Sequence, residues 1–345
     1  MISPRTPEEL AESLRETAVA RRTIRLGGAF TKDRLGGPVS AADETISTAC
    51  MRRLLQYEPK DLTISVEAGM PWAELENTLA AKGQMAPLDP PTGPGWEAAT
   101  VGGVIGANLS GPRRRLHGTA RDMVIGMTFA TLEGKLVRSG GMVVKNVAGL
   151  DMAKLMIGSF GTLAAVAIVN FKLFPIPPAS RTFAMEFGTA AEAFAERDRI
   201  LTTILAPAAI DIVNWPVGFR LLIRATGNAS VIARFTRELS GAHWVEGGEE
   251  TALWRGVREF TPRFLAANPA GGVVAMRSAI SEMAGVAGGL SGPFIARAGS
   301  GVIYAHHAAN APADPIHDET GIMKKVKRMF DPEGLLNRGR LHGYI

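Results

Sequence analysis

The residues of this chain that could do chemistry are mostly glycines, and they form two clusters. Gly27 and Gly28 follow a short apolar segment, and Gly102 and Gly103 follow Thr100. Glycine has no Cβ, so its backbone reaches positive φ and lets a ligand approach the main chain closely. Successive backbone N–H groups in such turns form concavities that bind anions without a lysine. The clusters predict a site for a diphosphate cofactor; the alternative is that these glycines only serve tight turns and close strand packing.

The common motifs for nucleotide sites and for nucleophilic catalysis are missing. No G-x-G-x-x-G opens a helix after a strand, so a dinucleotide site of the Rossmann type is unsupported. Residues 28–32 lack the spacing of a P-loop. Residues 158–161 (Gly-Ser-Phe-Gly) do not make a nucleophile elbow, which needs a residue on each side of the serine. A nucleotide cofactor would therefore have to bind by another design.

Cysteine and histidine, the usual ligands of soft metals, are sparse. Cys50 is the only cysteine among 345 residues, which excludes an intrachain disulfide and an iron–sulfur cluster held by four cysteines of this chain. His306 and His307 are adjacent at the end of an expected strand, where neighbouring side chains point to opposite faces. The other histidines are isolated. The sequence predicts no metal site and identifies no catalytic residue.

Composition and charge narrow the class of protein. The chain is 46% hydrophobic and 21% charged, which is typical of a globular protein, and its formal net charge is +5. The basic clusters at residues 113–115 and 324–328 have no aromatic residues between them, so we expect no binding to nucleic acid. No apolar run reaches the roughly 18 residues of a transmembrane segment, and no signal-peptide core opens the chain. We expect a soluble, cytoplasmic protein.

The first half of the chain is expected to alternate short helices and strands around the glycines. The Glu133-Gly134 turn between two apolar segments predicts a β-hairpin. Periodicity predicts helices over residues 6–16, 72–82 and 151–157 and strands over residues 22–26, 62–68, 124–130, 135–138 and 164–173. Prolines at 175, 177 and 178 then stop regular structure, which predicts a domain boundary there.

The second half begins a different pattern. Strand and helix patterns alternate over residues 182–187, 189–205, 210–214, 219–225, 230–239 and 243–245. Their β-α-β-β-α-β order is the split arrangement of ferredoxin-like domains. Later segments, up to residue 306, are expected to extend the same sheet. Residues 322–340 predict a basic helix that stops at Asp331-Pro332 and continues as a loop.

Three segments together resemble a known family. Residues 66–75, 99–175 and 330–340 are similar, in their order and spacing along the chain, to the FAD-binding domain shared by vanillyl-alcohol oxidase and p-cresol methylhydroxylase. More narrowly, residues 110–114, Arg121-Asp122 and residues 145–149 resemble the smaller FAD-binding subunit of bacterial glycolate oxidase. The resemblance hardly covers the middle of the chain.

The resemblance implies the fold and the cofactor. The implied fold is α+β, with a two-part FAD-binding domain of the vanillyl-alcohol oxidase type and a ferredoxin-like α+β cap domain. The expected division is residues 1–177 for the FAD-binding domain, 178–310 for the cap domain and 311–345 for a C-terminal return to the FAD-binding domain. The implied cofactor is FAD, held without a covalent bond.

The family's cofactor positions can be carried over residue by residue. The resemblance places the pyrophosphate at the two glycine clusters, the flavin near residues 89–91 and 107–110, and the adenine near residues 161–166. Asn337 and Arg340 would return to the isoalloxazine. Lys145 is a candidate for a cation near a reduced flavin; the alternatives are that it is a solvent-exposed turn lysine, or that Arg113, Arg114 or Arg340 supplies the cation. The implied cofactor-binding residues are Gly27, Gly28, Ala29, Thr31, Lys32, Pro90, Thr100, Val101, Gly102, Gly103, Ala107, Asn108, Ser110, Gly111, His117, Arg121, Asp122, Lys145, Gly161, Thr162, Val166 and Asn337.

The function that the resemblance implies is that of an FAD-binding subunit in a glycolate (2-hydroxy acid) oxidase or dehydrogenase complex. Its partners would be a larger FAD-binding subunit and an iron–sulfur subunit, and it would take part in flavin-mediated hydride and electron transfer. Such partners could also hold it at the inner membrane. Two alternatives stay open: a stand-alone FAD-dependent oxidase of a small alcohol, sugar or hydroxy acid, and a scaffold subunit that has lost flavin. The family's three-glycine loop reads Gly-Gly-Ala-Phe at residues 27–30, which keeps the scaffold alternative open.

Overall fold

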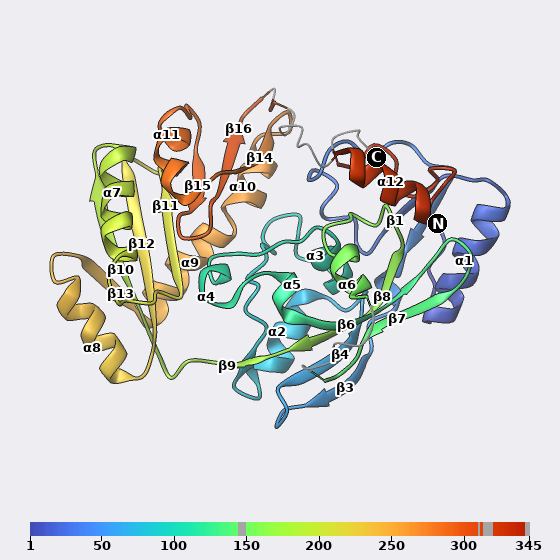
Figure 1. Cartoon of the computed structure of the whole chain (residues 1–345), viewed down its shortest axis with the longest axis horizontal. Coiled ribbons are helices and arrows are strands. Elements are labelled where there is room, and N and C mark those ends of the chain that lie inside the picture. The colour runs from blue at the N-terminus through green and yellow to red at the C-terminus, as the bar shows by residue number, and fades with distance from the viewer. Residues whose placement is uncertain (144–149, 310, 313–319, 342–345) are drawn as a thin grey trace.

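Two β-sheets with separate helical layers make up most of the molecule (Figure 1). This computed structural model describes residues 1–143, 150–309, 311–312 and 320–341. The two sheets share no strand, and the boundary expected after residue 177 falls between β9 (Phe174–Pro175) and β10 (Ala179–Phe187). No helix in the described ranges is both long and apolar enough to cross a membrane.

The first sheet has five antiparallel strands. Their order is β3 (Leu54–Glu58), β4 (Thr63–Glu67), β8 (Ala165–Lys172), β6 (Val124–Ala130) and β7 (Leu136–Gly140). Burial alternates along β8, as expected for a strand with differently packed faces. The helices α2 (Trp72–Ala80), α3 (Val101–Gly106), α5 (Ala120–Met123) and α6 (Met152–Met156) contribute to one core with this sheet. In that core Trp72 packs edge-on against Phe171, with ring centroids 6.2 Å apart.

A smaller unit next to this sheet carries the first glycine cluster. The helix α1 (Pro7–Val19) begins after Thr6, whose side chain accepts from Glu9 N. β1 (Ile24–Gly27) pairs in parallel with β2 (Glu44–Ser47), and η1 (Thr48–Cys50) follows. Ile24 also bridges to Leu336 in the C-terminal segment after α12 (Thr320–Phe330). β1 therefore ends at the glycine cluster, and the C-terminal segment lies beside it (Figure 1).

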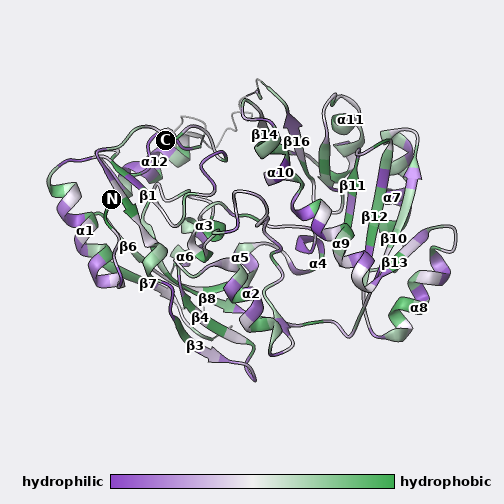
Figure 2. Cartoon of the chain, turned by 180° about the vertical axis from the view of Figure 1, so that it is seen from behind, coloured by the Kyte–Doolittle hydropathy of each residue, from purple (hydrophilic) through white to green (hydrophobic). Residues whose placement is uncertain are grey.

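The second sheet has seven strands in the order β13 (His243–Glu246), β10, β12 (Phe219–Gly227), β11 (Ala209–Val213), β15 (Phe294–Arg297), β16 (Val302–His307) and β14 (Gly272–Arg277). The first four, with α7 (Ala190–Leu201) and α8 (Ala229–Glu238), make the expected ferredoxin-like unit, and the last three extend its sheet. α7, α8 and α11 (Met283–Gly288, after η2, Ile280–Glu282) pack on one face, while α9 (Gly247–Arg258) covers the other, followed by α10 (Phe260–Ala267). The strands are mainly apolar (Figure 2).

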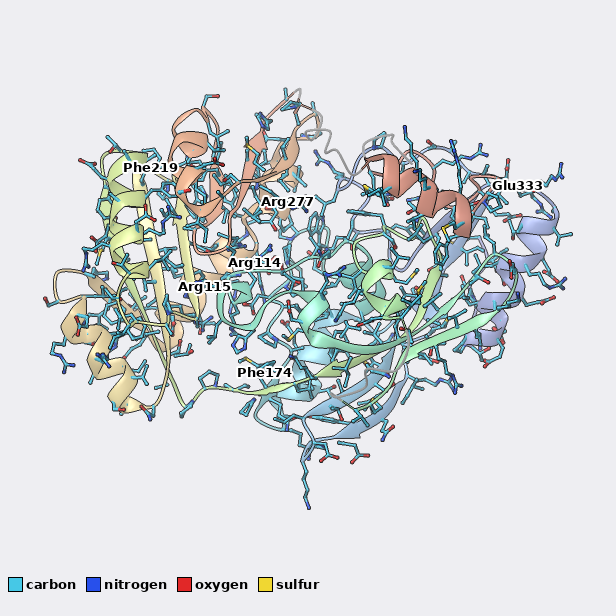
Figure 3. The ribbon with its side chains drawn as sticks, viewed as in Figure 1. Arg114, Arg115, Phe174, Phe219, Arg277 and Glu333 are labelled. Carbon is cyan, nitrogen blue, oxygen red and sulfur yellow. The ribbon has the colours of Figure 1, made fainter. Side chains whose placement is uncertain are left out.

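The part of the molecule built on the first sheet contacts the part built on the second sheet through arginine side chains. α4 (Arg114–His117) contacts β11, and its Arg114 and Arg115 lie between the sheets (Figure 3). The guanidinium of Arg34 donates to the carbonyl oxygens of Asn268, at 2.9 Å, and Gly271, at 2.7 Å. The short strands β5 (Gln84–Met85) and β9 pair on the way from the first sheet to the second.

Candidate functional site

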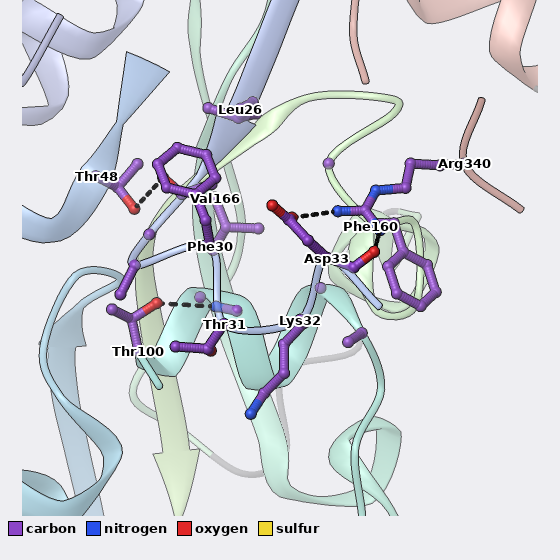
Figure 4. A pocket seen from close by; sticks show the side chains of 18 of the residues that line it. Leu26, Phe30, Thr31, Lys32, Asp33, Thr48, Thr100, Phe160, Val166 and Arg340 are labelled. Atoms are coloured by element: carbon purple, nitrogen blue, oxygen red, sulfur yellow. Dashed lines mark hydrogen bonds and ion pairs between the residues drawn. The ribbon is translucent and has the colours of Figure 1, made fainter. Parts of the chain in front are cut away.

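A pocket opens where β1 ends, between the loop after this strand and α3 (Figure 4). The hollow measures about 680 Å³, including the part that is open to solvent. Eleven residues implied by the family resemblance line it: Gly27, Gly28, Ala29, Thr31, Lys32, Thr100, Gly102, Gly103, Ala107, Gly161 and Val166. The tertiary structure thus gathers segments that are separated by more than a hundred residues in the sequence.

The loop after β1 has a run of backbone donors without acceptors. Within the described ranges, no protein group accepts from the backbone N–H of any residue from Gly28 to Lys32. Phe30 in this loop has φ +55°, so the chain turns sharply there. Successive N–H groups in such a turn form an anion-binding concavity. The loop therefore has the donors that a diphosphate requires.

The close approach of this loop to α3 requires glycine at residue 28. A Cβ on Gly28 would overlap Thr100 Oγ1 and would lie 2.8 Å from Thr100 Cγ2. The same hydroxyl caps α3 by accepting from Gly103 N, at 3.2 Å. Glycine at this position is thus explained by packing, and it also leaves its own N–H uncovered by a side chain.

In the second glycine cluster, the backbone N–H groups of Val101, Gly102 and Gly103 already have acceptors within the protein, and the expected contact of this cluster with the pyrophosphate stays a prediction. Residues 101–106 form the helix α3 instead of a loop. Val101 N donates to Met70 O at 2.9 Å, and Gly102 N donates to Ala68 O at 2.7 Å. Gly102 still lines the pocket, and its missing side chain lets the helix pack closely on Ala68, whose Cβ would lie 2.9 Å from an added Cβ.

Two buried polar atoms lie just after α3 without partners. Asn108 Oδ1 and Ser110 Oγ have no hydrogen-bond partner among the described residues. A buried polar atom left unsatisfied costs about 1–3 kcal/mol. Both residues follow Ala107, which lines the pocket, although neither lines it. Asn108 Oδ1 and Ser110 Oγ, next to the pocket, would fit the polar groups of a cofactor that extends past Ala107. The residues present therefore fit FAD.

Two side chains of the C-terminal segment, those of Asn337 and Arg340, bind it to the residues around the pocket. Asn337 is buried, and its amide accepts from Leu26 N at 2.7 Å and donates to Leu26 O at 2.9 Å and Phe160 O at 2.7 Å. Its amide groups are therefore used on backbone atoms, and its expected contact with the isoalloxazine stays a prediction. Arg340 does line the pocket, and its guanidinium donates to Asp33 Oδ1 at 2.7 Å (Figure 4).

Several other expected residues lie outside this pocket and support the segments around it. Asp122 accepts from Thr119 N at 2.8 Å and closes the capping box of α5, and Arg121 donates to Lys154 O at 2.7 Å. His117 packs edge-on against Phe174, 4.6 Å between centroids. The residues expected to bind the cofactor that do not line the pocket are Pro90, Val101, Asn108, Ser110, Gly111, His117, Arg121, Asp122, Thr162 and Asn337. Lys145 lies outside the residues that the structure describes.

The pocket also includes residues that the sequence did not single out. They are Leu26, Phe30, Asp33, Thr48, Gly106, Phe160 and Ala164. Phe30 and Asp33 belong to the glycine-rich loop, so their position next to the glycines was an available signal. Nothing in the local sequence pointed to Thr48 or Phe160, because both reach the pocket from separate segments.

The ring of His306, the first of the two adjacent histidines, contacts other protein groups. His306 is buried; its ring contacts Thr261 Oγ1 at 2.9 Å and Pro293 O at 3.2 Å. Burial lowers the pKa of His306 to about 4, so this imidazole is neutral at pH 7. Throughout the part of the chain that the structure describes, no three His, Cys, Asp or Glu side chains gather to hold a metal ion.

The chain is similar to several known proteins. A family model described as "FAD binding domain" matches residues 1–140. Glycolate oxidase subunit GlcE of Escherichia coli (strain K12) is 34% identical over 254 residues, which are 73% of this chain and 68% of GlcE. Glycolate oxidase subunit GlcD of Bacillus subtilis is 28% identical over 63% of this chain, and a D-lactate dehydrogenase of Anaerostipes hadrus 30% identical over 57%. The matches cover only 45% and 39% of these two relatives.

Solved structures match nearly the whole chain. The 4-ethylphenol oxidase from Gulosibacter chungangensis superposes with a TM-score of 0.72 at 15% identity, covering 99% of this chain and 88% of the oxidase. An alkyldihydroxyacetonephosphate synthase superposes with a TM-score of 0.71 at 16% identity, covering 97% and 75%. At these identities the matches show the fold alone, and they confirm the predicted α+β fold.

Proposed function

Because the chain belongs to the family of FAD-dependent oxidoreductases with this FAD-binding domain, we propose that it is the FAD-carrying subunit of a complex that oxidises glycolate or a related 2-hydroxy acid. The carrying observation is the match to GlcE, which spans about two thirds or more of both chains. The loop after β1, with its free N–H groups, supports FAD as the ligand. FAD, when bound, supplies the two-electron redox chemistry.

The residues of this chain bind and orient the cofactor. The loop of residues 28–32 offers donors to the diphosphate, and Asn108 and Ser110 offer polar atoms beyond it. Cys50 is exposed and is the only cysteine, so a four-cysteine iron–sulfur cluster has to belong to another subunit. We propose an iron–sulfur subunit and a larger FAD-binding subunit as the partners, because the chain is similar to a subunit of glycolate oxidase.

The freshly purified chain should be yellow, with a flavin absorbance band at about 450 nm. Acid precipitation should release the flavin into the supernatant as FAD, because the proposed attachment is non-covalent. The measurement is a visible spectrum before and after precipitation, with chromatographic identification of the released cofactor. A colourless chain that also fails to bind added FAD would favour the scaffold alternative, and colour retained in the pellet would show a covalent link.

A second candidate function, a stand-alone oxidase or dehydrogenase, is favoured by one cavity between the two halves. Its lining includes the guanidinium groups of Arg113, Arg224, Arg255 and Arg258, beside Asp89. Arg224 pairs with a glutamate at 3.1 Å and Arg258 with another at 2.7 Å. Arg255 has no ion pair among the described residues, so it could receive a carboxylate from a small acid.

An assay of the isolated, FAD-loaded chain with glycolate and a dye acceptor separates the two candidates. The subunit proposal expects no turnover above the background without partner subunits. Robust turnover by the chain alone would contradict it. In that case the Arg255→Ala variant should have a KM for glycolate raised about tenfold, because it loses one charge-assisted hydrogen bond to the substrate. Arg237→Ala, on the exposed side of α8, is the matched control.

A further inference from the structure

Lys32 is a buried lysine that lines the candidate cofactor pocket without a direct anionic partner. Its side chain is mostly enclosed, with the whole residue 7% exposed. Its Nζ donates to Pro91 O at 3.3 Å and lies 3.7 Å from the centroid of the Trp96 ring. No carboxylate within the described ranges lies within 4 Å of this Nζ. A carbonyl and an aromatic face stabilise an ammonium only in part.

The acidic groups near Lys32 are already occupied by other partners. Glu259, from the start of α10, acts on Lys32 at longer range. Its carboxylate accepts from Thr92 N at 2.9 Å, from Gly93 N and from Arg258 Nε at 2.7 Å. Asp33, the next residue in the loop, pairs with two arginines, Arg25 and Arg340. The protein itself therefore leaves Lys32 without a matched negative charge.

Burial lowers the pKa of Lys32 to about 7, and the attraction of Glu259, a smaller effect, opposes this shift. In the protein without an anionic ligand, a large fraction of Lys32 is then neutral at and above neutral pH. The backbone N–H of Lys32 also ends the run of free N–H groups, so this residue belongs to the same anion-binding loop and lines the same pocket. An anion there favours the charged form of the amine and raises its pKa.

We infer that Lys32 is a proton-coupled anchor for the cofactor: when the diphosphate of FAD enters the pocket, the neutral amine takes a proton from solvent and its ammonium pairs with the diphosphate. The inference rests on the proposed function, since FAD supplies the diphosphate. No covalent bond changes, and the only exchange with solvent is the proton. Lys32 acts as a positioning residue in this step and takes no part in oxidation.

The sign of the pH dependence follows. Below the pKa of free Lys32 the amine is already charged, so the affinity for FAD should be independent of pH. Above it, each binding event must first protonate the amine, so Kd should rise by up to about tenfold per pH unit. At pH 8 the binding of FAD should take up close to one proton.

Calorimetric titration of the apo chain with FAD at pH 8, in two buffers of different ionisation enthalpy, counts the protons directly. Lys32→Arg, which keeps a fixed charge, should bind FAD with no proton uptake and a flat pH profile. Lys32→Met should also lose the uptake and should bind more weakly at pH 6. Lys82→Met, at an exposed position, should behave as the unaltered chain does. Circular dichroism checks that each variant is folded.

Two further ligands, ADP and riboflavin, test whether the diphosphate is the anion that raises the pKa of Lys32. ADP, which has the diphosphate without the flavin, should show the same proton uptake as FAD, and riboflavin should show none. FAD binding without proton uptake by the unaltered chain, or uptake that persists in Lys32→Met, would overturn the role of Lys32. Failure of the unaltered chain to bind FAD at any pH would instead contradict the proposed function, so the two failures can be told apart.

Discussion

Replacing Gly28 by alanine is expected to weaken FAD binding by about 100-fold, equal to about 3 kcal/mol. The added Cβ would overlap Thr100 Oγ1 and press on Thr100 Cγ2. Thr100 cannot move away easily, because its hydroxyl caps α3 and its residue is buried. The loop after β1 must therefore move, and its N–H groups no longer converge on one anion. Fluorescence titration of FAD into the apo variant measures the effect.

A matched control is available on α9. Gly256 has no heavy atom within 4 Å of an added Cβ, and it lies inside a helix. Gly256→Ala should leave the affinity for FAD unchanged and should raise the free energy of unfolding by about 0.5–1 kcal/mol. If Gly28→Ala binds FAD within threefold of the unaltered chain, the loop does not form the diphosphate site.

Lys327→Met is expected to lower the free energy of unfolding by about 3–5 kcal/mol. The Nζ of this buried lysine donates to Asp331 Oδ2 at 2.6 Å, to Thr162 O at 2.7 Å and to Leu336 O at 2.9 Å. Asp331 is buried as well and accepts from the backbone N–H of Leu335 and Leu336. Removing the ammonium leaves a buried carboxylate without its counter-charge. Urea denaturation, followed by circular dichroism, measures the loss.

Two variants test this explanation. Lys324→Met, on the exposed side of the same helix, should change stability by less than about 0.5 kcal/mol. The double variant Lys327→Met/Asp331→Asn should recover part of the loss, because the uncompensated charge is gone. A loss below about 1 kcal/mol for Lys327→Met would show that this ion pair does not hold the C-terminal segment. That segment positions Arg340 at the pocket and Asn337 against the backbone of Leu26 and Phe160, so weaker FAD binding should accompany the loss.

Local patterns predicted most elements because their causes are local. The Glu133-Gly134 turn forms the hairpin of β6 and β7, since Gly134 supplies a φ of +79°. The predicted ends of the elements were less exact. The helix α7 was expected to end at residue 205, but it ends at Leu201, and Thr202 is its C-cap. The strands β2 and β3 were missed because they are short and depend on pairing with β1 and β4.

The helix α3 shows where local reasoning fails. Three glycines in six residues disfavour a helix by about 1 kcal/mol each, so the sequence favoured a loop. In the structure Thr100 caps this segment, and Met70 and Ala68 accept its first N–H groups. These acceptors lie about thirty residues earlier in the chain, and no local pattern shows that they are near. The sequence therefore predicted free N–H donors in both clusters, whereas those of Val101 and Gly102 already have acceptors in the protein.

The sequence by itself determined the family, the α+β fold and the glycine-rich loop at residues 27–32, because motifs and periodicity are properties of neighbouring residues. Only the tertiary structure decided which N–H groups are free for a ligand. It also decided that the Asn337 amide hydrogen-bonds to the backbone of Leu26, 311 residues away, while Arg340 lines the pocket. The physical reason is that a hydrogen-bonding group serves a ligand only when no protein group has satisfied it, and those partners come from distant parts of the chain.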